Sequence, residues 1–255
     1  MKNQIKLLFM LMILTAGFYS CEKVNDNSDE IMGCRKLEKP DEVEANVVTK
    51  IEAKVENASK YSNVVEVKLM VYDLSIDDYI ELVRSDWKDG GFTIDLPKTI
   101  DTNYLQVSAY NRGLLNPIAD PSLNITISNK NVKAGTAYFG GIDKAGNVVT
   151  WFYPFKIDED GNADEAFYSY VDSDVTISGY DETEAVQDFT VNEIRYLALI
   201  KTSTIYSVGL KKGWNVWCLS SIRCEQDFTI TNMWSTTPNS VLKWYGFEDK
   251  WELLD

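Results

Sequence analysis

The stretch VVTKIEAKVE, residues 47–56, places apolar and polar side chains in alternation along the chain. Ile51, Ala53 and Val55 occupy every second position, and charged residues stand between them. A helix with one apolar face needs a period near 3.6 residues, whereas a strand with one buried face needs a period of two. The stretch therefore predicts a β-strand, and VVEVKLMVYDL at 64–74 repeats the pattern.

Similar short runs, separated by turn residues, continue to the end of the chain, and no long amphipathic helix appears among them. The turns are rich in Gly, Asp and Asn, as in KDGG at 88–91, KAGN at 144–147 and DGN at 160–162. The further predicted strands are FTIDLP, YLQVSAY, LNITISN, DVTISGY, IRYLALI, TIYSVGL, WNVWCLS, DFTITNMW and VLKWYGF. This spacing predicts an all-β fold of one or two β-sandwich domains.

We expect an N-terminal sandwich domain over residues 43–133 and a C-terminal one over 134–255. The boundary is a soft one, near residues 131–136, because no linker marks it. Six of the seven tryptophans lie in residues 151–255, which predicts different cores for the two halves.

Residues 1–20 have the order of a secretory signal peptide. Lys2 and Lys6 give a positive start, and LLFMLMIL at 7–14 forms an apolar centre shorter than the ~20 residues a membrane-spanning helix needs. FYSC at 18–21 resembles a bacterial lipobox, which implies cleavage before Cys21 and a lipid on its sulfur. The alternative is an ordinary signal peptide with Cys21 as a chance residue.

Residues 21–42 are polar, charged and without hydrophobic periodicity, so we expect a flexible tether between the lipid and the folded body. In lipoproteins of Bacteroides-like bacteria, an acidic stretch after the lipidated cysteine often accompanies export. The resemblance implies an outer-membrane lipoprotein, at the cell surface rather than on the periplasmic face.

The charge and the missing histidine exclude whole classes of function. Two of the 25 basic residues fall in 1–20, which leaves 23 against 39 acidic residues, a formal charge of −16 for the remainder. Such a surface repels nucleic acid, so no nucleic-acid partner is expected. Without histidine there is no Ser–His–Asp or Cys–His catalysis and no histidine-ligated metal site. We therefore expect no cofactor, no metal and no catalytic residues, which favours a non-enzyme.

The cysteines leave two readings open. Cys218 and Cys224 lie in WCLSSIRC, where a turn between them would allow a cross-strand disulfide. A pair of reduced, partly buried thiols is equally compatible with the sequence. Cys34 lies in the tether and is expected to be free.

Two motifs invite a chemical interpretation and fail on inspection. DEDGNAD at 158–164 carries enough acids for calcium, but aligning Gly161 to the glycine of an EF-hand loop puts Lys156 and Phe167 at ligand positions, so a hairpin turn is favoured. Ser240 and Lys243 match S-x-x-K, but a strand would point them to opposite faces. Paired carboxylates of a glycosidase cannot be identified from the sequence.

Aromatic residues offer a better candidate for ligand binding. Trp151, Phe152 and Tyr153 are adjacent, so neighbouring rings in a strand must face opposite ways. Trp214 and Trp217 differ by three positions and must also face apart. Most such rings fill cores, and one or two could remain as a platform for sugar rings.

Three segments carry a wider resemblance: GGFTIDLP at 90–97, GWNVW at 213–217 and TTPNSVLKWYGF at 236–247. They resemble segments of uncharacterised surface lipoproteins of Bacteroides-like bacteria. The resemblance implies an immunoglobulin-like build and no particular activity. We therefore expect a lipid-anchored protein that binds or adheres, with a glycan as the leading ligand. The alternatives are a structural or assembly subunit of an envelope complex and, third, a histidine-free hydrolase.

Overall fold

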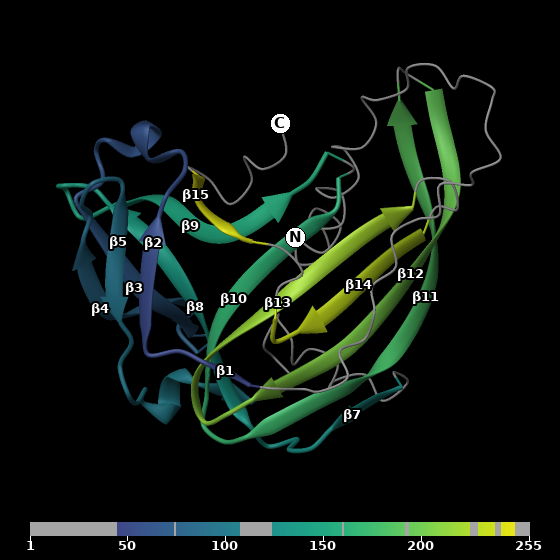
Figure 1. Cartoon of the computed structure of the whole chain (residues 1–255), viewed down its shortest axis with the longest axis horizontal. Coiled ribbons are helices and arrows are strands. Elements are labelled where there is room, and N and C mark those ends of the chain that lie inside the picture. Colours follow the sequence, from purple (N-terminus) through teal and green to yellow (C-terminus); the bar gives the residue numbers. More distant parts are fainter. Residues whose placement is uncertain are drawn as a thin grey trace.

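The computed structural model of the chain describes residues 45–73, 75–107, 124–159, 161–191, 194–224, 229–237 and 241–247, with the backbone alone at 187–191 and 194–198 (Figure 1). The expected signal peptide, the tether, Cys21 and Cys34 lie outside these ranges. Within them the protein is almost entirely strand, which confirms the prediction of an all-β fold.

The described residues form fifteen strands and two short 3-10 turns. Their bounds are β1 (Asn46–Val47), β2 (Lys50–Lys54), η1 (Ala58–Tyr61), β3 (Glu66–Asp73), β4 (Asp78–Asp86), β5 (Gly91–Asp95), η2 (Thr102–Tyr104), β6 (Gln106–Val107), β7 (Ile125–Ile127), β8 (Lys133–Ile142), β9 (Val148–Ile157), β10 (Ala163–Val171), β11 (Val175–Val191), β12 (Ile194–Leu210), β13 (Gly213–Cys224), β14 (Thr229–Ser235) and β15 (Lys243–Phe247).

Thirteen strands form one large sheet. Ten of them follow one another in the order β4-β3-β8-β9-β10-β13-β14-β12-β11-β7. The other three are short and pair with strands inside this order: β1 with β13, β15 with β9, and β6 with β8. Every pairing between these strands is antiparallel except that of β12 with β14, which is parallel. Two parallel strands cannot be joined by a tight hairpin, so a longer connection must return the chain to the same end of the sheet. Strand β13 is that connection between β12 and β14.

A second sheet of two strands, β2 and β5, covers one face of the large sheet and closes the first core. In β2, Ile51 and Ala53 are buried while the lysines and Glu52 between them are exposed, as the period of two predicts. These residues pack with Phe92, Phe139 and Phe152. Phe152 is completely buried, and burying such a side chain contributes about 1.5–3 kcal/mol.

The second core forms at the other end of the large sheet, where β7, β11 and β12 lie. Trp217, Tyr206, Ile177 and Leu210 are among its largest members. Successive side chains of β10 belong to different cores: Tyr170 lies in the first core and Val171 in the second. Because successive residues of a strand face opposite ways, the two cores lie on opposite faces of the same sheet.

The sheet is not interrupted at the expected domain boundary between residues 133 and 134. Strand β8 begins at Lys133, and it pairs with β3 from the expected N-terminal domain and with β9 and β10 from the expected C-terminal one. The first core likewise combines Ile51 and Phe92 with Trp214 and Trp244. Sheet and core therefore continue across that position.

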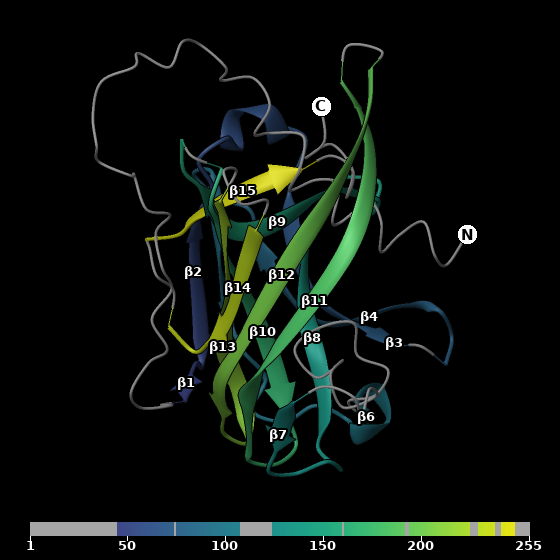
Figure 2. The same cartoon turned by 90° about the vertical axis from the view of Figure 1, so that its right-hand side faces the viewer.

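Strands β11 and β12 form a hairpin that extends beyond the other strands (Figures 1 and 2). They pair along their whole length, from Val175 opposite Leu210 to Val191 opposite Ile194. Near the base of the hairpin, β7 and β14 flank it. Among the described residues no helix is long and apolar enough to cross a membrane.

Candidate functional site

Strand β9 sends its aromatic side chains to two different environments. Phe152 enters the first core, while Trp151 and Tyr153 are half-buried on the opposite face, as the adjacency of the three rings predicted. Trp214 and Trp217 also face apart, as predicted, but both are buried, one in each core. The indole of Trp214 donates to the carbonyl of Pro97 at 2.9 Å, so it is a core residue and not a platform.

A group of half-buried rings lies on the face of the sheet opposite the first core. Register places Tyr245 opposite Tyr153, and Lys243 opposite Phe155, so β15 and β9 present these side chains on one face. The ring centroids of Phe155 and Tyr245 are 4.7 Å apart, those of Phe155 and Phe247 are 5.4 Å apart, and those of Tyr153 and Phe247 are 6.3 Å apart. We call Tyr153, Phe155, Tyr245 and Phe247 the aromatic face.

The same surface continues across β8 and β4. Trp151 lies beside Tyr153 on β9, and its ring centroid is 5.0 Å from that of Tyr79 and 6.3 Å from that of Tyr138. Tyr79 and Tyr138 meet edge to face at 5.1 Å. Such tilted arrangements are the favourable geometry for aromatic pairs, so each ring holds its neighbour in place.

Glu165 supplies a carboxyl group to the aromatic face. It lies on β10 directly opposite Phe155, and paired residues of adjacent strands project to the same side. Its side chain is half-buried, and no hydrogen bond to it comes from any residue within the described ranges. Burial among apolar groups disfavours the charged form and raises the pKa of Glu165 to about 7.

The phenol of Tyr153 lies near this carboxyl, and further phenols lie near Tyr153. The pKa of Tyr153 is raised strongly, first by burial and then by the nearby oxygens of Tyr138, Tyr79 and Glu165. Tyr138, Tyr79 and Glu165 therefore lie close enough to Tyr153 to influence its ionisation. Half-buried rings surrounding a few polar groups that orient a ligand are the usual composition of a small-molecule or sugar site.

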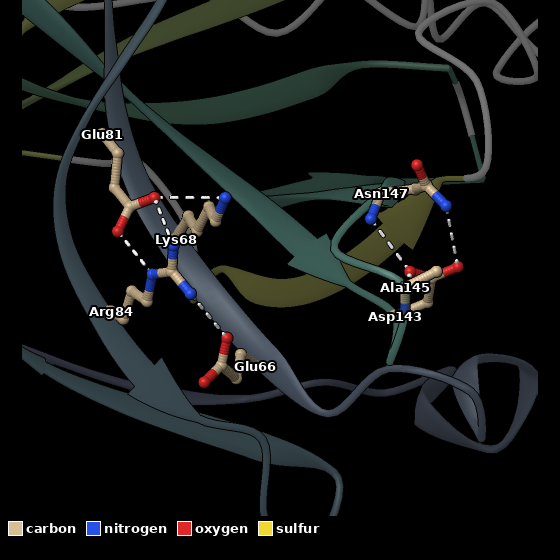
Figure 3. Close-up of polar contacts among 7 residues, drawn as sticks. All are labelled: Glu66, Lys68, Glu81, Arg84, Asp143, Ala145 and Asn147. Atoms are coloured by element: carbon tan, nitrogen blue, oxygen red, sulfur yellow. Dashed lines mark hydrogen bonds and ion pairs between the residues drawn. The ribbon is translucent and has the colours of Figure 1, made fainter.

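A network of ion pairs borders the same sheet face on β3 and β4 (Figure 3). Arg84 bridges Glu81, its neighbour on β4, and Glu66 on β3, and Lys68 reaches Glu81 at 3.1 Å. The hydrogen bond from Arg84 is the first cause of a lowered pKa at Glu81. Exposed ion pairs of this kind add little stability, so the network mainly fixes the charge pattern of the edge.

The acidic segment at 158–164 forms a turn. Asp158 accepts hydrogen bonds from the backbone and side-chain amides of Asn162, at 2.9 and 3.0 Å. Asp143 makes the same contacts with Asn147, and it also accepts from the amide of Ala145 (Figure 3). These carboxylates are engaged by the amides of their own turns, which supports the turn interpretation over a calcium loop. Asp160 lies outside the described residues.

The S-x-x-K match has only one described member. Lys243 opens β15, a strand and not a helix, and forms an ion pair with Glu56 at 3.1 Å. Ser240 lies outside the described residues. Lys243 thus serves an exposed ion pair between β15 and the segment after β2.

Of the two readings left open for Cys218 and Cys224, a disulfide between them is wrong, and a pair of reduced thiols holds only for Cys218. WCLSSIRC has no turn: both cysteines lie on the continuous strand β13, six residues apart, or about 20 Å at the rise of a strand. A disulfide needs Cα atoms within about 7 Å. Cys218 is a free, completely buried thiol, whereas Cys224 is disulfide-bonded to a cysteine outside the described residues.

Neither family models nor curated proteins nor solved structures yield a match to this chain. The aromatic face and its carboxyl group are therefore interpreted from their own chemistry. Sequence reasoning found Trp151 and Tyr153 but missed Glu165, Tyr245 and Phe247. The signal that could have found the last two was the alternation of Tyr245 and Phe247 around Gly246, typical of a strand with one aromatic side.

Proposed function

We propose that this protein is a lipid-anchored envelope protein with a non-catalytic binding role, and that the aromatic face binds a glycan. The observation that carries the proposal is the group of rings on β9 and β15 with Glu165 beside it. Sugar rings carry apolar C–H faces that stack on aromatic side chains, and their hydroxyls pair with phenols and carboxyls. The face offers both kinds of group.

The charges of the molecule favour neutral or amino-substituted glycans over acidic ones. The chain carries a formal charge of −14, and the carboxyl of Glu165 is the ionisable acid of the site. A uronate or sialylated sugar would bring a second carboxylate against both. A hydroxyl or an ammonium group would instead find an acceptor there.

The anchor half of the proposal rests on the lipobox-like segment at 18–21 and the signal-like residues before it. An outer-membrane location, at the cell surface, is consistent with a binding function for extracellular glycans. A lipoprotein with a diacylglyceryl group and an added acyl chain exceeds the one-chain affinity that is only marginal for membrane binding.

We also propose an immunoglobulin-like build for the folded body. The support is the packing of the β2–β5 sheet over the large sheet across a shared apolar core, which is the layer arrangement of a sandwich. The resemblance of the three segments at 90–97, 213–217 and 236–247 to surface lipoproteins points the same way.

A glycan array probed with the mature chain carrying Cys21→Ser tests the binding role. We expect binding to neutral or amino glycans, weakened at least about tenfold by Tyr245→Ala, a loss of about 1.4 kcal/mol. Tyr180→Ala is the matched control, because Tyr180 is 43% exposed on β11, outside the aromatic face. Absence of binding to any glycan, or equal losses in both variants, would contradict the proposal.

The second candidate is an assembly subunit, and the β11–β12 hairpin favours it. Val186 and Leu199 lie opposite each other and are 66% and 48% exposed. Exposed apolar pairs on a projecting hairpin suit a contact with another envelope protein. Cross-linking in membranes that captures one defined partner, lost in Val186→Lys but kept in Tyr245→Ala, would favour this function over glycan binding.

A further inference from the structure

Cys224 raises the question of its bonding partner. It is the last residue of β13, it is 7% exposed, and it is disulfide-bonded. Cys218 is a free thiol, and its place about 20 Å along the same strand excludes it on geometry as well. The sequence contains four cysteines, so the partner is Cys21 or Cys34.

We infer that Cys34 is the partner, so that a disulfide fastens the tether to the end of β13. The choice between the two cysteines rests on the proposed function, because a lipidated Cys21 has its sulfur in a thioether. A thioether sulfur carries no proton to lose and cannot take part in thiol–disulfide exchange. Cys34 is then the cysteine that remains, and the inference replaces the expectation that Cys34 is free.

The chain length allows this connection. The first described strand, β1, places Asn46 opposite Val216, eight residues before Cys224 on β13. Eight residues of strand span about 26 Å. The 12 steps from Cys34 to Asn46 can reach about 40 Å when extended. The chain between Cys34 and Asn46 is therefore long enough for Cys34 to reach Cys224.

Formation of the bond requires an oxidant of the envelope. An oxidised dithiol protein accepts attack by one cysteine thiolate, which forms a mixed disulfide. The second cysteine thiolate then attacks the protein's own sulfur in that mixed disulfide. The Cys34–Cys224 bond forms, both thiol protons pass to solvent or to the carrier, and the carrier leaves as a reduced dithiol holding the two electrons.

The bond changes how far the body can move from its anchor. Without it, the 25 steps from Cys21 to Asn46 allow a reach of about 85 Å. With it, the 13 steps from Cys21 to Cys34 allow about 45 Å, and they end at Cys224. The bond would therefore roughly halve the longest reach of the tether, and that reach would be measured from Cys224 at the end of β13.

Peptide mapping of the full chain from membranes, under non-reducing conditions with free thiols blocked, tests the inference. We expect a linked peptide containing Cys34 and Cys224, a blocked Cys218, and a separate Cys21 peptide with the mass of a lipid. A Cys21–Cys224 peptide would overturn both this inference and the lipid anchor. A Cys34–Cys224 peptide beside an unmodified Cys21 would support the link and overturn the anchor alone.

Variants supply an independent measurement. Cys34→Ser removes a link that closes a loop of nearly 200 residues, and we expect Tm to fall by about 10 °C. Cys34→Ser combined with Cys224→Ser should fall no further, because both changes remove the same bond. Cys218→Ala is the control that keeps the linked peptide. A blocked, unlinked Cys34 in the wild-type protein, or an unchanged Tm in Cys34→Ser, would contradict the inference.

Discussion

Trp214 and Trp217 lie three residues apart on β13 and point into different cores. The indole of Trp214 packs edge to face on Tyr170 at 5.7 Å, and that of Trp217 stacks on Phe167 at 4.7 Å. Strand β13 is thus buried on both faces, and it links the packing of the two ends of the molecule.

Truncation of Trp217 should therefore destabilise the whole protein. Trp217→Ala removes a ring that is 2% exposed and leaves a cavity between Phe167 and Trp234, so we expect a loss of about 3–5 kcal/mol in the free energy of unfolding. Urea denaturation measures it. Val241→Ala, at a position 84% exposed, should change stability by less than about 0.5 kcal/mol. A loss below about 1 kcal/mol at Trp217 would count against the second core.

Substitution of Gly246 should be costly for steric reasons. A Cβ at Gly246 would lie 2.3 Å from the ring of Tyr61, whose hydroxyl donates to the carbonyl of Gly246. Gly246→Ala should cost about 1–3 kcal/mol by overpacking. The control is Gly161→Asn: a Cβ there has open space, and Asn tolerates its φ of +76°. Thermal melting of both variants measures the difference in stability between them. If the Tyr61 ring can move aside for the new methyl group, the two variants will be equally stable.

Glu165 should make stability depend on pH. Its pKa is about 7 in the folded protein, above the ordinary value of 4.5, so the folded state binds more protons between pH 4.5 and 7. Stability from this group is present below pH 4.5 and is lost as pH rises through 7. For a half-buried group, screening reduces the effect to about 1–2 kcal/mol.

Comparison with Glu165→Gln isolates this contribution from that of the other acids. The variant should gain stability over the wild type at pH 8 and lose that gain at pH 4. Urea denaturation at the two pH values provides the measurement. Parallel stability profiles for the two proteins would show that Glu165 titrates normally.

Cys218 should resist alkylation. Burial, and then the carboxylate of Asp164, raise the pKa of this thiol to about 12, and the side chain is completely buried. The thiolate is the nucleophile, so iodoacetamide at pH 8 should leave Cys218 unmodified in the native protein and modify it in denaturant. Mass spectrometry of the Cys218 peptide distinguishes the two states. Rapid native labelling would mean that β13 opens readily.

Alternation and turn residues predicted much of the fold. The Asp89–Gly90 turn forms with positive φ at both residues, and the loops at Asp143 and Asp158 close as hairpin turns. These signals are local, and local geometry decides them. The period of two likewise placed Ile51 and Ala53 in the core, because a strand exposes its side chains to only two environments.

In β13, the turn expected between Cys218 and Cys224 is absent. Ser220 and Ser221 resemble turn residues, yet they are 1% and 3% exposed within a continuous strand. Ser220 donates a hydrogen bond to Asp164 on β10, and Ser221 pairs with Asn232 on β14 at 2.7 Å. Partners more than ten residues away satisfy these hydroxyls, and nothing in the octapeptide WCLSSIRC reveals them.

The long β11–β12 hairpin and the aromatic face could not be predicted from the sequence, because both depend on which strands pair. The alternation predicts a strand ending at Tyr180 and assigns no structure to the acidic run after it, but that run continues β11 because β12 pairs with it residue by residue. Glu165 looked like one of many surface acids. Only the pairing of β10 with β9 places it opposite Phe155.

The pairing of the earliest strands with the latest ones sets the timing of folding. Asn46 pairs with Val216, and the backbone at Val55 and Glu56 meets Trp244. A chain that is synthesised amino end first has no sheet edge to pair with these strands until nearly all of it has been made. The early segments must remain unpaired, with apolar side chains exposed, until then, so we expect slow folding and a dependence on chaperones that hold unfolded chains.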